Sequence, residues 1–84
     1  MKVTLKLYAT LSDYLPEEAR KTNQVPLDVP PQTTIDQLID QYRLPPGLVH
    51  LVLVNGHYVP PGMRARQALH EGDVLAIWPP IAGG

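Results

Sequence analysis

The chain has 84 residues, of which 44% are hydrophobic and 18% are charged. This balance is typical of a single globular domain and argues against disorder, which requires low hydrophobicity and high net charge. The formal net charge of -1 lacks the positive field that draws proteins to phosphate backbones or anionic lipid, so we expect neither nucleic acid nor membrane as a partner. The sequence contains no cysteine, which excludes disulfides, thiolate nucleophiles and thiolate metal sites together.

The start of the chain does not have the pattern of a secretory signal. Lys6, Ser12 and Asp13 interrupt it before an apolar stretch of useful length accumulates. No run approaches the roughly 20 apolar residues that a membrane-spanning helix needs. We therefore expect a soluble protein of the cytoplasm.

Two strands are predicted in the first third of the chain. Residues 2–8 alternate between apolar and polar side chains, which is the pattern of a half-buried strand. Residues 24–29 alternate again, but Pro26 has no amide hydrogen to donate, so this strand is expected at an edge of the sheet. Between the two strands, residues 9–15 are predicted to form a short helix or turn and residues 17–23 a surface loop.

A short helix is predicted to begin after Thr34. Thr34 and Gln37 have the spacing of a capping box, in which each residue bonds the backbone of the other. Pro45 and Pro46 require the helix to end before them, because proline disfavours the helical conformation of the preceding residue. Apolar residues at helical spacing give this helix one face that should lie on a sheet, and they are Ile35, Leu38, Ile39 and Tyr42.

The remaining strands complete a recognisable order of elements. Residues 48–54 and 57–59 flank Asn55-Gly56, the strongest short-range signal for a β-hairpin. Residues 74–78 are apolar on both faces, as in a strand at the middle of a sheet. The order of two strands, one helix and three strands matches the ubiquitin-like β-grasp fold of the α+β class. In that fold the first and last strands pair in parallel at the centre of a mixed five-stranded sheet, and the helix covers one face.

The body is expected to end at residue 78, and the last six residues are expected to form an extended, free tail. The two prolines that open the tail cannot donate to a sheet ladder, so the chain should leave the last strand there. The two glycines that close it have no side chain and can thread a narrow channel. A tail of this shape suits insertion into the active site of another protein. Its residues are Pro79, Pro80, Ile81, Ala82, Gly83 and Gly84.

Taken alone, two final glycines are most often a frayed chain end. The last third of the chain changes this interpretation, because three of its segments together resemble the MoaD/ThiS family of ubiquitin-like sulfur carriers. The segments are residues 53–56 (Leu-Val-Asn-Gly), 69–74 (Leu-His-Glu-Gly-Asp-Val) and 78–84 (Trp-Pro-Pro-Ile-Ala-Gly-Gly). The predicted order of elements extends the resemblance to nearly the whole chain. Within the family, the Pro-Pro before the tail is most similar to the small subunit of molybdopterin synthase.

The resemblance implies a carrier and co-substrate rather than an enzyme, with Gly84 as the reactive residue. An E1-like adenylyltransferase would use ATP and Mg²⁺ to convert the Gly84 carboxylate to an acyl adenylate, and a persulfide donor would leave a thiocarboxylate. The sulfur would then pass to a pterin precursor in the large subunit of molybdopterin synthase, for a molybdenum or tungsten cofactor. The chain itself is expected to bind no cofactor, and it contains no Walker-type phosphate loop.

A carrier also needs a docking surface, and the uncovered face of the sheet is the natural candidate. Alternation allows two parities. The one preferred here places Val52, Val54, Leu75 and Ile77 beneath the helix, and Leu51, Leu53, Val74, Ala76 and Trp78 on the open face; the opposite parity is the alternative. Exposed apolar patches mark interaction sites, and Trp is enriched at binding hot spots. The alternative is that Trp78 caps an edge of the core. The predicted partner-binding residues are Leu51, Leu53, Trp78, Pro79, Pro80, Ile81, Ala82 and Gly83.

Several other charged or titratable side chains are expected to be ordinary surface groups. The histidines lack the close spacing of a metal site, so no metal is expected. Two carboxylates on the predicted helix and two arginines in a loop are expected to be solvated. These residues are His50, His57, His70, Asp36, Asp40, Arg64 and Arg66.

Three other functions use the same predicted fold. The chain can be a sulfur carrier for another pathway, such as thiamine or cysteine synthesis. It can be a ubiquitin-like protein modifier that is joined through Gly84 to lysines. It can also be a plain β-grasp interaction module with no chemistry at its terminus.

Overall fold

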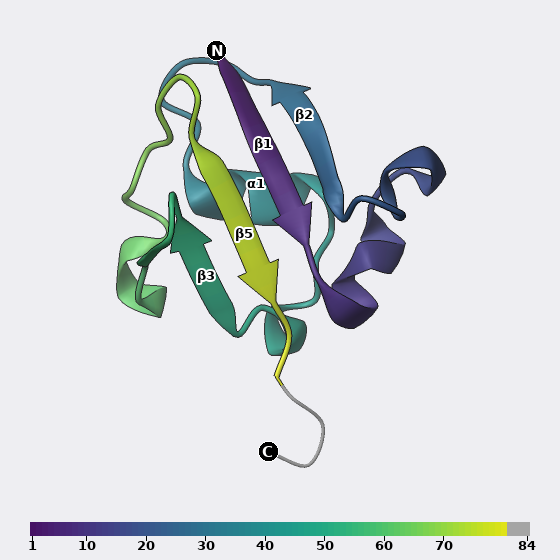
Figure 1. Ribbon diagram of the computed structural model, residues 1–84. Coiled ribbons are helices and arrows are strands. Elements are labelled where there is room, and N and C mark those ends of the chain that lie inside the picture. Colours follow the sequence, from purple (N-terminus) through teal and green to yellow (C-terminus); the bar gives the residue numbers. More distant parts are fainter. Residues whose placement is uncertain (81–84) are drawn as a thin grey trace.

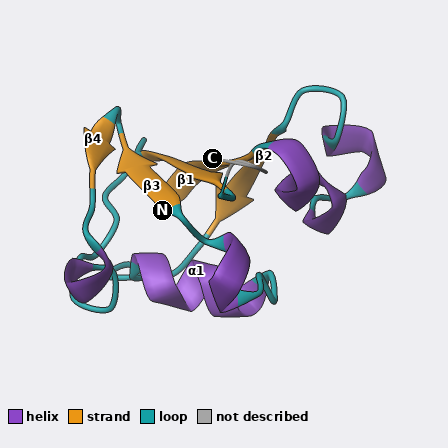
Figure 2. Ribbon diagram, turned by 90° about the horizontal axis from the view of Figure 1, so that it is seen from below, coloured by secondary structure: helices purple, strands orange, loops and turns teal. Residues whose placement is uncertain are grey.

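A mixed five-stranded sheet and one α-helix form two layers in the computed structural model, which describes residues 1–80 (Figures 1 and 2). The strand order is β2-β1-β5-β3-β4, with β1 and β5 parallel at the centre and all other neighbours antiparallel. The predicted β-grasp fold is confirmed. The elements are β1 (Lys2–Leu7), β2 (Gln24–Asp28), α1 (Ile35–Gln41), β3 (Leu51–Val54), β4 (His57–Tyr58) and β5 (Val74–Trp78).

The helix begins where the sequence predicted. The Gln37 amide donates to the Thr34 hydroxyl at 3.2 Å, and the Thr34 amide donates to the Gln37 side-chain oxygen at 2.8 Å, which completes the capping box. The buried residues of α1 are Ile35, Leu38 and Ile39. Tyr42 caps the other end and packs half-buried against the core, and this burial raises the pKa of its phenol.

The hairpin and the edge strand follow their predicted chemistry. Asn55 and Gly56 have φ of 50° and 81°, and positive φ at both central residues defines a type I′ turn between β3 and β4. Pro26 lies in β2 opposite Thr4, and β2 forms one edge of the sheet. A residue without an amide hydrogen is tolerated there because the outer side of an edge strand has no neighbour to receive it.

Two segments are more ordered than predicted. β3 begins at Leu51 rather than residue 48, because Pro46–Leu48 forms a 3-10 helix in which the Leu48 amide donates to the Pro45 carbonyl at 2.9 Å. The predicted loop of residues 17–23 contains a second 3-10 helix, Glu17–Ala19. The side chain of Ala19 is buried in the core, so this segment is not merely a surface loop. Two further 3-10 helices in the described chain are Ala9–Tyr14 and Pro61–Met63.

The prediction that Arg64 is a solvated loop cation is wrong. Its side chain is only 6% exposed. The guanidinium donates through Nε to the Val59 carbonyl at 3.1 Å and through Nη2 to the His50 carbonyl at 3.2 Å. One carbonyl belongs to the residue before β3 and the other to the residue after β4. Without the guanidinium, these backbone acceptors would be left without partners. Arg66 is exposed, as predicted.

Candidate partner-docking site

The two faces of the sheet differ as the alternation predicted, because α1 covers only one of them (Figure 2). The four residues placed beneath the helix all belong to the buried core: Val52, Val54, Leu75 and Ile77. On the opposite face, the half-exposed residues from the predicted set are Leu51, Leu53, Val74 and Trp78. Ala76 is 8% exposed although it lies on that face, because the larger Lys6 and Leu53 flank it on the neighbouring strands.

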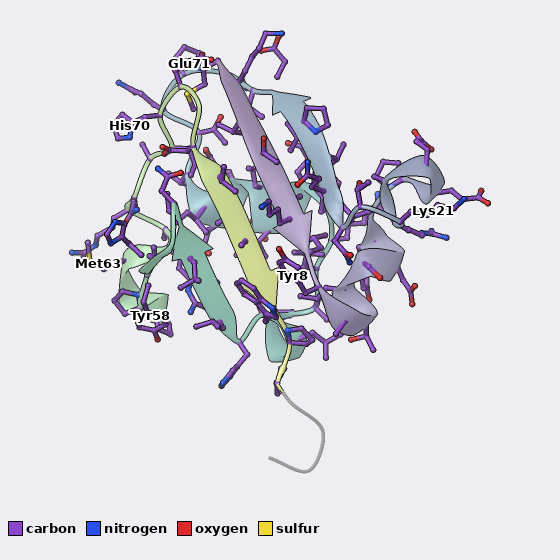
Figure 3. All side chains as sticks on the ribbon, viewed as in Figure 1. Tyr8, Lys21, Tyr58, Met63, His70 and Glu71 are labelled. Atoms are coloured by element: carbon purple, nitrogen blue, oxygen red, sulfur yellow. The ribbon has the colours of Figure 1, made fainter. Side chains whose placement is uncertain are left out.

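Trp78, the last residue of β5, stacks against Tyr8. The ring centroids are 4.4 Å apart and the ring planes differ by 5°. Tyr8 follows directly after β1, and its amide continues the parallel ladder by donating to the Ile77 carbonyl at 3.2 Å. Tyr8 therefore lies at the end of the sheet from which the chain leaves the body (Figure 3). Stacked rings at this position form a rigid platform with little side-chain entropy left to lose on binding.

Trp78 does not cap the core edge. It is absent both from the buried core and from the partly buried hydrophobic residues packed against that core within residues 1–80. On its other side it pairs with Leu51 of β3. We call the half-exposed apolar surface at this end of the open face the tail-base surface, and it consists of Tyr8, Leu51, Leu53 and Trp78.

Sequence reasoning missed Tyr8. The signal was available, because parallel pairing of the first and last strands brings the ends of both strands to the same edge of the sheet. Ala9 follows Tyr8 with a φ of 52°, a left-handed conformation that costs a non-glycine residue about 1 kcal/mol. This residue turns the chain out of β1 and into the 3-10 helix Ala9–Tyr14, directly beside the aromatic stack.

The tail begins at the tail-base surface. Pro79 is buried and Pro80 is exposed, and both continue beyond the end of β5 (Figure 1). The other predicted tail residues lie outside the described part of the chain, so their roles remain predictions: Ile81, Ala82, Gly83 and Gly84.

A cavity of ≈ 320 Å³ lies on the helix side of the molecule. Asp36 and Asp40 of α1 and the buried Arg64 line it together with apolar side chains. Asp36 is half-buried and Asp40 is exposed, and the predicted histidines are all exposed. No group of three or more His, Cys, Asp or Glu within residues 1–80 is placed to hold a metal ion. Nor is any helix in that range long and apolar enough to cross a membrane.

The comparisons with known proteins agree with this architecture. The model of the ThiS family matches residues 9–84. The chain belongs to the ThiS family. Because the match runs to residue 84, it includes the tail as well as most of the β-grasp body. The resemblance inferred from the sequence is thereby confirmed.

The similar proteins bear the names of two kinds of protein, sulfur-carrier subunits and a small modifier. The molybdopterin synthase sulfur carrier subunit of Drosophila melanogaster is 30% identical over 78 residues, which cover 93% of this chain and 87% of the fly protein. The structure of small archaeal modifier protein 1 from Haloferax volcanii has a TM-score of 0.65 and 26% identity, with both chains covered in full. A chain in the complex of subunits 1 and 2 of molybdopterin-converting factor from Helicobacter pylori has a TM-score of 0.61 and 19% identity, again with full coverage of both. At this identity the likeness supports the fold alone.

Proposed function

We propose that this ThiS-family chain is a sulfur carrier whose Gly84 carboxyl is converted to a thiocarboxylate for molybdopterin synthesis. The observation that carries the proposal is the match of the family along the tail to residue 84, together with a fly relative that is a molybdopterin synthase sulfur carrier subunit. The geometry of the body supports it, because β5 leads directly into the tail beside a half-exposed aromatic stack. Such a platform suits a partner that must hold the body while it handles the last residue.

The chemistry must be supplied largely by other proteins. A C-terminal carboxyl group has an ordinary pKa of about 3.5, so at neutral pH it is an anion that resists nucleophilic attack. An E1-like adenylyltransferase that uses ATP and Mg²⁺ would transfer AMP to Gly84 and release pyrophosphate. A persulfide sulfur would then displace AMP, and a thiol reductant would cleave the acyl disulfide to leave the thiocarboxylate. The chain has no cysteine with which to carry out this exchange itself.

The proposed acceptor is the large subunit of molybdopterin synthase, which would place the sulfur on a pterin precursor in the cytoplasm. A chain of the same fold from Helicobacter pylori belongs to a complex of subunits 1 and 2 of molybdopterin-converting factor. In this proposal the chain is the non-catalytic subunit. Its body would bind the large subunit, and its tail would carry Gly84 into the active site of that subunit. Other sulfur-accepting pathways would use the same carrier chemistry.

A second function is favoured by one observation, the full-length likeness to small archaeal modifier protein 1. A protein modifier would use the same fold and the same activated carboxyl. The two functions diverge at the nucleophile, because sulfur attack gives a thiocarboxylate whereas a lysine amine gives an isopeptide bond.

Intact mass spectrometry separates these functions. The chain is incubated with the adenylyltransferase of its own genome, ATP, Mg²⁺ and a persulfide donor. A mass gain equal to the exchange of one oxygen for sulfur is expected of the carrier, whereas adducts on lysines of other proteins would favour the modifier. No change, under conditions that charge a known carrier, would favour a plain interaction module.

The reactive residue is tested by changes at the tail. Deletion of Gly84, or addition of one residue after it, is expected to abolish sulfur transfer without altering thermal unfolding. Gly47→Ala is the control, because an added Cβ at Gly47 meets nothing within 4 Å. Sulfur transfer at the normal rate by the deletion variant would show that Gly84 is not the reactive residue.

A further inference from the structure

Among the described strand residues, Lys6 is the one charged side chain that the register places on the tail-base half of the open face. It lies on β1 two residues before Tyr8, and its register partners are Ala76 on one side and Gln24 on the other. The other charged residues that the strand register places on this face are Lys2 and Asp28, which are paired with each other at the opposite end of β1. A single cation therefore lies beside the apolar tail-base surface.

The ammonium of Lys6 has no ionic partner in the body. Among residues 1–80 the ion pairs within 4.0 Å are those of the Met1 amino group with Asp28 and of His70 with Asp73. No hydrogen bond from the Lys6 side chain is formed within the described chain either. The residue is nevertheless half-buried, and it is in register with the small Ala76 of β5.

This position matters when a partner covers the surface. A partner that packs on Trp78 and Leu51 removes water from the neighbourhood of Lys6. A cation that loses its water without gaining an opposite charge is strongly destabilising, whereas a facing carboxylate offsets the loss and fixes the register of docking. No carboxylate among residues 1–80 forms an ion pair with Lys6 within 4.0 Å, so a facing carboxylate would have to come from the partner.

We propose that Lys6 is the charge-recognition residue of the tail-base surface, and that the partner which docks there presents an Asp or Glu carboxylate to its ammonium. This inference rests on the proposed function, because it assumes that a partner covers the tail-base surface when it handles Gly84. It adds the chemistry of that partner, which is an apolar patch with one acidic side chain. A partner without the carboxylate would be selected against by the unpaired cation.

The test measures the KM for the carrier in the adenylation reaction, with pyrophosphate release as the readout. The probe is the adenylyltransferase of the same genome. Lys6→Met keeps the apolar stem and removes the charge, and Lys6→Glu reverses the charge. Lys21→Glu is the matched control for Lys6→Glu, because both substitutions change the net charge by the same amount. Lys21 is exposed in the loop after the 3-10 helix Glu17–Ala19 (Figure 3).

The expected KM of Lys6→Met differs according to whether the partner presents a carboxylate to Lys6. With a facing carboxylate, Lys6→Met is expected to raise KM about fivefold and Lys6→Glu by more than about tenfold, while kcat is unchanged because the reacting carbon is elsewhere. Lys21→Glu should stay within about twofold, as is typical of a surface charge outside an interface. Without a facing carboxylate, Lys6→Met should bind as well as the wild type or better, because a cation no longer has to be desolvated.

Ionic strength gives a second readout. From about 0.05 M to about 0.5 M salt, the KM of the wild type should rise more steeply than that of Lys6→Met, since screening weakens only the charged pair. An unchanged or lower KM for Lys6→Met, or equal effects of the two Glu variants, would overturn the inference. In that case the wild type would still be adenylylated and the proposed function would stand. If the wild type itself is not adenylylated, both fall together.

Discussion

The covered and open faces of the sheet both receive apolar side chains from the central strands β3 and β5, yet these side chains differ in burial. On the covered face, Leu75 and Ile77 of β5 are fully buried and hold the body together. On the open face, Trp78 of the same strand is half-exposed and stacks on Tyr8. One strand thus contributes buried side chains to the core and half-exposed side chains to the proposed docking surface. Apolar character therefore does not by itself show which role a residue has, and the position of the helix decides it.

The largest expected effect breaks the covered face. Leu75→Ala leaves a cavity at the centre of the core, where Leu75 is 0% exposed, and should lower the free energy of unfolding by about 3–4 kcal/mol. Leu53→Ala on the half-exposed face is the matched control and should cost about 1 kcal/mol, because its side chain is already partly in water. Urea unfolding followed by circular dichroism measures both. Equal losses would contradict the assignment of the two faces.

A smaller loss is expected at the arginine that ties the hairpin to the body. Arg64→Met keeps the buried stem but leaves the Val59 and His50 carbonyls without their donors, which should cost about 2–3 kcal/mol. Arg66→Met changes an exposed arginine two residues away and should stay within about 0.5 kcal/mol. Thermal unfolding of the two variants side by side gives the comparison. If both behave alike, the two hydrogen bonds of Arg64 do not contribute to stability.

On the open face, a substitution is expected to lower partner affinity more than it lowers folding stability. Trp78→Ala loses the stack with Tyr8, which is worth about 1 kcal/mol of folding stability, because the indole is outside the core. Its effect on partner affinity should be larger, about 2 kcal/mol or more, as for an aromatic hot spot. Calorimetric titration with the adenylyltransferase, paired with a melting curve, measures both quantities. Unfolding of the variant without a separate binding defect would show that Trp78 serves the core instead.

Local chemistry explains which parts of the fold could be predicted from the sequence. The capping box of Thr34 and Gln37 and the Asn55-Gly56 turn depend on neighbours along the chain, and both were predicted correctly. The burial of Arg64 depends on two carbonyls at positions 50 and 59 that only the folded hairpin brings to it. A polar residue in a Pro-Gly loop carries no sign of such distant acceptors, so its role could not be seen.

The candidate site divides in the same way. Alternation along β3 and β5 predicted that Leu51, Leu53 and Trp78 share one face, and the preferred parity, with these residues on the open face, is confirmed. Tyr8 was missed although its strand was predicted, because its importance arises only from the parallel register that brings it beside Trp78. The predicted roles of Gly83 and Gly84 stay predictions, because they concern a reaction at the terminus and these residues lie outside residues 1–80.

The smallest expected effect concerns pH on the covered side. Burial raises the pKa of Tyr42 above its ordinary value of 10.0, so the folded protein holds the phenol proton more tightly than the unfolded chain. Its contribution to stability is therefore fully present below the unfolded pKa and is lost as the pH rises through the folded value. Tyr42→Phe cannot ionise, so between about pH 9 and about pH 11 it should lose less stability than the wild type. Urea unfolding at the two pH values measures the difference, with Tyr58→Phe on the exposed edge as the control for removing a phenol. A wild type that loses no more stability than Tyr42→Phe would mean that this phenol ionises equally well in the folded and unfolded chain.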